Sequence, residues 1–171
     1  MSAVTSKSNW VIPGRLIQGA YPGSLNPEEH LDLLETILET GVNTFVSLLH
    51  PSEKSLFKPY EEDVTLLVPE RRMKFINLPI VDMSVTDDES ILNLAKHIVL
   101  RLKTTDDVFY IHCWGGHGRS GTLVAVILTL LGMSAEEAIL HVNECHRSRS
   151  YNGKIPSPQT KQQEQQVYRL A

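Results

Sequence analysis

The stretch VFYIHCWGGHGRSGTLVAVILTLL, residues 108–131, decides the fold. Its first part, residues 108–112, is a short apolar run of the length and composition of a buried strand. Its last part, residues 123–131, is apolar on every side, which predicts a helix in the centre of a domain, too short to cross a bilayer. A glycine-rich loop joins the two parts. A strand, a loop and a helix in this order are typical of layered α/β domains.

The segments on either side of this stretch continue the alternation of strands and helices. Short strands are predicted around the Pro13-Gly14 turn, over residues 42–49 and over residues 75–79. Helices are predicted after three N-cap residues, which are Asn26, Thr86 and Ser134, and a last polar helix over residues 159–170. Together the segments predict an α/β domain with a central, mostly parallel sheet flanked by helices. In such sheets ligands bind at the carboxyl ends of the strands, where the glycine-rich loop lies.

Composition describes a single globular unit. The chain has 171 residues, of which 42% are hydrophobic, and 16 Lys and Arg against 20 Asp and Glu give a net charge of −4. This charge argues against nucleic acid or an anionic membrane as the main partner. Two cysteines exclude a disulfide-rich secreted scaffold, so we expect a cytoplasmic or nuclear protein. Residues 1–9 are polar and are expected to be a flexible segment, followed by one domain over residues 10–171.

The glycine-rich loop has the composition of a phosphate site. Closely spaced glycines before a helix let backbone N–H groups converge on a tetrahedral anion, and the positive end of the helix favours negative charge there. Cys113 begins the loop and Arg119 ends it. An arginine fork binds two phosphate oxygens at once and so holds the anion against the thiol. The same positive surroundings favour the thiolate, which is the nucleophilic form of cysteine.

His112-Cys113, five further residues and Arg119-Ser120 match the HCx5R(S/T) signature, and the chain resembles the protein tyrosine phosphatase superfamily. The short chain looks most like a compact atypical dual-specificity phosphatase. Three further stretches are similar to members of this family: residues 10–16, the general-acid loop at residues 78–82, and a glutamine motif at residues 159–163.

The resemblance implies a role for each residue of the site. Cys113 would be the nucleophile that forms a cysteinyl-phosphate intermediate, and Arg119 would bind the phosphoryl oxygens. Ser120 would hydrogen-bond the departing sulfur, and His112 would order the loop. Asp82 would be the general acid and base, because it stands in a loop just after a strand, whereas Asp87 and Asp88 are explained as anions in the first turn of a helix.

The rest of the loop would bind phosphate through its backbone, and these residues are Trp114, Gly115, Gly116, His117 and Gly118. The side chains of Trp114 and His117 either rim the pocket or occupy positions that the loop tolerates. Gln159 and Gln163 would orient the hydrolytic water. The resemblance implies a monomeric protein phosphatase for phosphotyrosine, with phosphoserine and phosphothreonine as further substrates, that uses neither metal nor cofactor.

Other interpretations stay open at this point. Residues 116–121 read G-x-G-x-x-G, as in dinucleotide-binding domains, but a helix start stands where a second strand with an acidic end is needed. A pseudophosphatase would keep the loop without turnover, and a Cys–His protease on Cys113 leaves Arg119 unexplained. His141, Cys145 and His146 have a spacing that suits metal ligands, although Cys145 also fits a buried apolar position. The substrate could instead be a phosphoinositide or an RNA 5′-phosphate.

Overall fold

The computed structural model describes residues 2–171 and contains a six-stranded sheet with the strand order β1-β2-β3-β6-β4-β5. The strands are β1 (Ala3–Thr5), β2 (Ser8–Ile12), β3 (Leu16–Gly19), β4 (Thr44–Ser47), β5 (Lys74–Asn77) and β6 (Phe109–His112). β3, β6, β4 and β5 run parallel, while β1 and β2 form antiparallel pairs at one edge. The prediction of a mostly parallel sheet is therefore confirmed.

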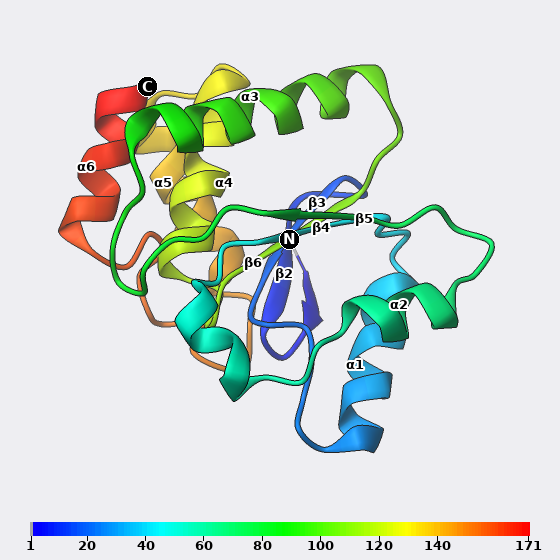
Figure 1. The fold of residues 1–171 in the computed structure, drawn as a ribbon. Coiled ribbons are helices and arrows are strands. Elements are labelled where there is room, and N and C mark those ends of the chain that lie inside the picture. The colour runs from blue at the N-terminus through cyan, green and yellow to red at the C-terminus, as the bar shows by residue number, and fades with distance from the viewer. Residues whose placement is uncertain (1) are drawn as a thin grey trace.

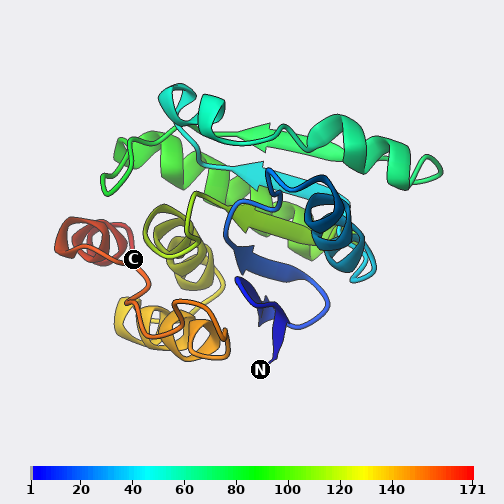
Figure 2. The same cartoon turned by 90° about the horizontal axis from the view of Figure 1, so that it is seen from below.

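Helices cover both faces of this sheet. Figures 1 and 2 show α3, α4, α5 and α6 on one face and α1 and α2 on the other. Their bounds are α1 (Pro27–Leu38), α2 (Glu61–Leu67), α3 (Asp88–Thr104), α4 (Gly118–Leu130), α5 (Ala135–His146) and α6 (Lys161–Leu170), with a 3₁₀ helix η1 (Pro51–Leu56). Each face has its own apolar core, one around α4 and the other around Phe45 and Tyr110. None of the helices within residues 2–171 is long and apolar enough to cross a membrane.

The central helix is buried as its composition predicts. In α4 every residue from Gly118 to Leu128 is buried, including Arg119. α3, α5 and α6 all contact α4. Burial on all sides explains why this helix has no polar face, and it fixes the orientation of the loop that precedes it.

The N-terminal prediction is wrong for the residues that the structure describes. Residues 1–9 were expected to be flexible, but Ala3–Thr5 forms β1 and Ser8 begins β2. The pairing depends on backbone groups, which need no apolar side chains, and a 2.7 Å hydrogen bond joins the hydroxyls of Thr5 and Ser8. Polar composition was therefore a poor guide at this edge of the sheet.

Two of the three predicted N-caps are confirmed. The Asn26 side chain accepts hydrogen bonds from the N–H groups of Glu28 and Glu29, and Ser134 forms a capping box with Glu137. Thr86 is not the cap of α3, because Asp87 accepts from the Ser90 N–H at 2.8 Å. Asp87 therefore stabilises a helix start, which strengthens the choice of Asp82 as the residue available for chemistry.

Candidate active site

The loop of residues 113–117 runs from the end of β6 to the start of α4, at the carboxyl end of the parallel strands. Gly116 has φ +77°, and a Cβ there would lie 2.3 Å from the carbonyl carbon of Gly19. Both facts require glycine at this position. The loop is thus held against the end of β3, and its course is fixed by the neighbouring strand.

Cys113 and Ser120 lie together at the base of the loop. Cys113 is only 3% exposed, and its Sγ lies 3.5 Å from Ser120 Oγ. Gln18 Nε2 donates to the same Ser120 oxygen at 3.2 Å and to the Gly116 carbonyl at 2.9 Å. Because Ser120 accepts from Gln18, its own hydroxyl hydrogen can be donated to a sulfur anion.

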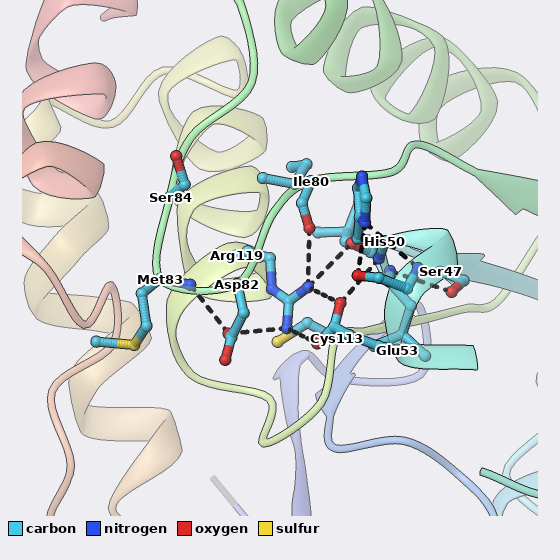
Figure 3. A network of polar contacts seen from close by, with 12 residues as sticks. Ser47, His50, Glu53, Ile80, Asp82, Met83, Ser84, Cys113 and Arg119 are labelled. Carbon is cyan, nitrogen blue, oxygen red and sulfur yellow. Dashed lines mark hydrogen bonds and ion pairs between the residues drawn. The ribbon is translucent and has the colours of Figure 1, made fainter. Parts of the chain in front are cut away.

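Arg119 is held by a carboxylate that the sequence analysis missed. Both oxygens of Glu53, in η1, accept from the guanidinium, from Nη1 at 2.6 Å and from Nη2 at 2.9 Å, as Figure 3 shows. The Ile80 carbonyl accepts from Nη1 at 2.9 Å. Burial opposes ionisation of Glu53, but hydrogen bonds from Arg119 and the His50 backbone outweigh it and hold the Glu53 pKa below its usual value.

This arrangement leaves part of the guanidinium for a substrate. Glu53 occupies the edge formed by Nη1 and Nη2. Among residues 2–171, no acceptor contacts the buried Nε, so a phosphoryl oxygen can bind there. The bidentate contact typical of arginine is completed when a second phosphoryl oxygen takes the place of Asp82 at Nη2.

Asp82 lies at this same edge. Its Oδ1 accepts from Arg119 Nη2 at 2.9 Å and also from the Met83 N–H at 3.0 Å (Figure 3). The Asp82 side chain is 53% exposed, whereas that of Arg119 is 1% exposed. The structure therefore brings together Cys113, Arg119, Ser120 and Asp82, as the resemblance implied, with the carboxylate on the solvent side.

His112 is buried behind the nucleophile. Its Nδ1 lies 3.1 Å from the Cys113 carbonyl and its Nε2 lies 2.7 Å from the Tyr60 hydroxyl. Burial lowers the pKa of His112 to about 4, so the ring is neutral at pH 7. A neutral ring that donates from Nδ1 to the carbonyl accepts at Nε2 from Tyr60, which fixes both its tautomer and its orientation.

His146 and Arg149 support the loop from behind. The ring of His117, at the end of the loop, is directed toward His146, with its Nδ1 2.9 Å from His146 Nε2. Arg149 is 4% exposed and donates to the Gln18 carbonyl at 3.0 Å and to the Gly115 carbonyl at 3.4 Å. Burial lowers the pKa of Arg149 to about 10, so it keeps its charge at pH 7.

The predicted glutamines differ in what they contact. Gln163 is buried, accepts through Oε1 from the Gln159 and Thr160 N–H groups, and donates through Nε2 to the Ser84 carbonyl. Its amide also lies against Gly118, where a Cβ would be 2.8 Å away. Because these contacts use both ends of the Gln163 amide, this residue connects the acid loop to α6. The water-orienting role stays a prediction for Gln159 and Gln163.

The structure gives little support to the dinucleotide-binding and metal-binding interpretations of the motifs. α5 follows α4 directly, so the second strand of a dinucleotide-binding unit is missing from residues 118–146. Cys145 is buried, as its apolar spacing predicts, and its Sγ lies 3.5 Å from His141 Nε2. Within residues 2–171 no group of three or more His, Cys, Asp or Glu side chains is arranged to hold a metal ion.

The fold is the cysteine phosphatase fold. Residues 5–167 match the family model described as "Swiss Army Knife protein, DSP-PTPase phosphatase domain", and the chain belongs to this family. A protein of invertebrate iridescent virus 6 named "Putative tyrosine phosphatase 197R" is 34% identical over 134 residues, which are 75% of this chain and 44% of the viral protein. The chain thus spans less than half the length of that relative.

Solved structures share the fold. The crystal structure of Tk-PTP in its active form has a TM-score of 0.71 at 23% identity and covers 96% of this chain and 95% of its own. PTPMT1 in complex with PI(5)P has a TM-score of 0.72 at 17% identity and covers 95% and 93%. The tyrosine phosphatase fold inferred from the motif is therefore confirmed.

Proposed function

We propose that this domain hydrolyses phosphate monoesters of proteins, phosphotyrosine first and phosphoserine and phosphothreonine in addition, through a covalent intermediate on Cys113. The observation that carries the proposal is the guanidinium of Arg119, whose Nη1/Nη2 edge is bound by Glu53 and whose buried Nε is free of acceptors in the described chain. A cation fixed in this way beside a buried cysteine suits an oxyanion that must be held in line with the sulfur.

In the first step the Cys113 thiolate attacks phosphorus and the bond from phosphorus to the substrate oxygen breaks. Arg119 binds two of the phosphoryl oxygens as charge develops on them. Asp82, on the solvent side of the guanidinium, donates a proton to the leaving phenolate or alkoxide. The products of this step are the free alcohol and a cysteinyl-phosphate.

In the second step water attacks phosphorus and the sulfur–phosphorus bond breaks. The Asp82 carboxylate accepts a proton from the water, and inorganic phosphate is released. Ser120, 3.5 Å from Sγ, donates its hydroxyl hydrogen to the departing thiolate. Gln18 holds the Ser120 oxygen in place for this contact.

Turnover of a small aryl phosphate in the presence of a chelator tests the proposal. The wild-type protein should be active and the Cys113→Ser protein inactive, because serine lacks the thiolate that attacks phosphorus. Activity that is equal in the two proteins, or that chelator alone abolishes, contradicts the mechanism.

The role of Asp82 predicts a dependence on the leaving group. Asp82→Asn should slow substrates with poor leaving groups by about 10²- to 10⁴-fold and those with good leaving groups far less, since only a basic leaving oxygen needs the proton. Asp87→Asn is the matched control, because Asn also caps α3. A leaving-group effect in Asp87→Asn and none in Asp82→Asn would overturn the assignment.

A phosphoinositide is the second candidate substrate. The observation in its favour is that PTPMT1, which shares the fold, was crystallised with PI(5)P. Against it, the loop of residues 113–119 contains no lysine to meet additional phosphates. A panel of phosphopeptides and soluble phosphoinositides compared by kcat/KM distinguishes the two.

We further propose that the domain works as a monomer in a reducing compartment of the cytoplasm or nucleus, without nucleic acid or membrane as its main partner. The net charge of −4 and the two cysteines support this setting. A catalytic thiolate also requires that Cys113 stay reduced.

A further inference from the structure

A cavity of about 320 Å³ lies beside the catalytic loop, and the proposed reaction uses none of the side chains that line it. Three of its lining residues, Trp114, Gly115 and His117, belong to the loop itself. Trp114 directly follows Cys113, and successive Cα atoms are about 3.8 Å apart. A group bound in this cavity is therefore within reach of a substrate whose phosphoryl group lies over Cys113.

The walls of this cavity combine aromatic rings with one cation. Phe57, Trp114 and Tyr151 contribute rings, and Lys7 contributes the positive charge. No Asp or Glu is among the residues that line it within the described part of the chain. Lys7 therefore has no carboxylate partner inside the cavity, and its charge is available to an anionic group of a ligand.

Lys7 is held in place by the fold. It lies in the turn between β1 and β2, where its carbonyl accepts from the Ala20 N–H at 3.0 Å and its N–H donates to Thr5 Oγ1 at 3.1 Å. Its Nζ lies 4.8 Å from the ring centroid of Tyr151, a cation–π distance. The Tyr151 N–H in turn donates to the Ser6 carbonyl at 3.0 Å. The cation and its aromatic support are thus fixed relative to one another.

The surface next to this cavity is also positive. A second cavity of about 540 Å³ shares Asn152 with the first, and its lining includes Arg147 and Lys154, both exposed. Within residues 2–171, both cavities thus have cations and no Asp or Glu among their lining residues, in a chain whose net charge is −4. A local positive region on an acidic protein attracts anions to that side.

We infer that the Lys7 cavity, defined by Lys7, Trp114 and Tyr151, binds an acidic side chain of a phosphopeptide one or two residues from the phosphorylated residue. This inference rests on the proposed function and names the peptide class that the site accepts. A peptide fits better than a polyphosphorylated headgroup, because the lining offers a single lysine for one carboxylate and aromatic rings beside it for the methylene groups of a glutamate.

Two phosphotyrosine peptides that differ only in Glu or Gln beside the phosphotyrosine test this inference. The ratio of their kcat/KM values is the readout, so overall changes in activity cancel. Wild-type protein should prefer the Glu peptide by about three- to tenfold at low salt, and the preference should shrink as ionic strength rises. Lys7→Gln should bring the ratio close to one, and Lys7→Glu should invert it.

Lys103→Gln is the matched control, since this lysine is exposed on α3 and lines none of these cavities. Tyr151→Leu removes the ring beneath Lys7 and should lower the ratio part of the way. A ratio that Lys7→Gln leaves unchanged overturns the inference. So does a Lys7-dependent preference for a soluble phosphoinositide bisphosphate with none for the acidic peptide.

Binding of the same two peptides to the Cys113→Ser protein distinguishes a failure of the proposed function from a failure of the inference about the Lys7 cavity. If the wild-type protein turns over neither peptide, the proposed function fails, while the ratio of the two dissociation constants still decides whether the Lys7 cavity recognises an acidic side chain.

Discussion

At the scale of single residues, the proposed chemistry depends on which groups accept hydrogen bonds from the buried Arg119 guanidinium. The Arg119 guanidinium has five N–H donors, and the structure gives one edge to Glu53 and leaves another toward Asp82. A buried arginine without a carboxylate partner would be costly and free to rotate. In the proposed mechanism Glu53 is therefore a positioning residue, which orients Arg119 without touching the substrate.

Replacement of Glu53 by Gln should disturb this orientation. We expect kcat/KM for a small aryl phosphate to fall by about ten- to hundredfold, because small displacements of a positioned group have effects of this size. The loss should appear for good and poor leaving groups alike, since the proton donor is intact. Glu62→Gln, on the exposed side of α2, is the control. Wild-type kinetics in Glu53→Gln would show that Arg119 needs no such partner.

Some residues of the site were predicted from the sequence, and others were missed. Cys113, Arg119, Ser120 and Asp82 were found because they stand at fixed spacings in one signature or beside a strand end. Glu53 and Tyr60 were missed, since each reaches the loop from more than 50 residues away. The one local signal at Glu53 is a capping box with His50, which explains the residue without its partner.

At the scale of secondary-structure elements, α6 positions the acid loop. Three side chains on one face of α6 contact residues 84–88. Gln163 donates to the Ser84 carbonyl at 3.1 Å, Gln166 donates to the Thr86 carbonyl at 2.7 Å, and Arg169 forms two 2.7 Å contacts with Asp88. Their spacing of three residues places them on the same side of a helix. The loop that carries Asp82 is thus attached to α6 just beyond the acid.

Removal of the central contact should affect proton transfer first. Gln166→Ala loses the bonds to Thr86 and Asp88, so we expect kcat for poor leaving groups to fall by a larger factor than kcat for good ones. Gln165→Ala, on the exposed face of α6, is the control. Equal losses for all leaving groups would indicate a general structural defect and contradict a role in placing Asp82.

The elements also show the limits of local patterns. Capping signals predicted the starts of α1 and α5, because an N-cap is a contact within four residues. The same reasoning placed the start of α3 one residue early, since Thr86 and Asp87 are both good caps and only the course of the acid loop selects between them. β1 had no apolar pattern, and its pairing could not be predicted from residues 3–5 alone.

At the scale of the whole molecule, the catalytic loop is packed against neutral histidines. Burial lowers the pKa of His112 to about 4, of His117 to about 4 and of His146 to about 3, from the usual 6.5. In the unfolded chain each ring takes up a proton below pH 6.5, whereas in the folded chain it does so only near pH 4 or below. The unfolded state therefore binds more protons in this window.

Stability should consequently fall as the pH drops from about 6.5 toward 4. For His112 alone the loss is on the order of 3 kcal/mol over the window. The pKa of Asp107 is lowered to about 2, so the stability that its carboxylate contributes is lost only below the unfolded pKa of 3.8, outside this pH window. Chemical denaturation at a series of pH values measures the free energy of unfolding directly.

A variant isolates part of this effect. His146→Gln removes one of the three rings and should flatten the dependence of the unfolding free energy on pH between 4 and 6.5. His97→Gln, exposed on α3, should leave the slope unchanged. A slope that is absent in the wild-type protein, or equal in His146→Gln, would contradict the burial of these rings in their neutral form.

The overall architecture followed from the sequence because alternation of strands and helices leaves few arrangements for a chain of this length. What could not be predicted is the layer beneath the loop. His146 and Arg149 follow their contacts in the loop by 29 and 34 residues, and the fold buries both of them against the loop. Only the three-dimensional arrangement shows that the segment containing them supports the site.

The central claim is that the phosphoryl group passes through Cys113, and trapping it there is the most direct test. Ser120→Ala removes the hydroxyl 3.5 Å from the sulfur and should slow departure of the thiolate, so that the intermediate accumulates. After reaction with an aryl phosphate and quenching in denaturant, peptide mass spectrometry should find one phosphoryl group on Cys113. Turnover with no phosphoryl group on the protein, or with one on another residue, would contradict the account.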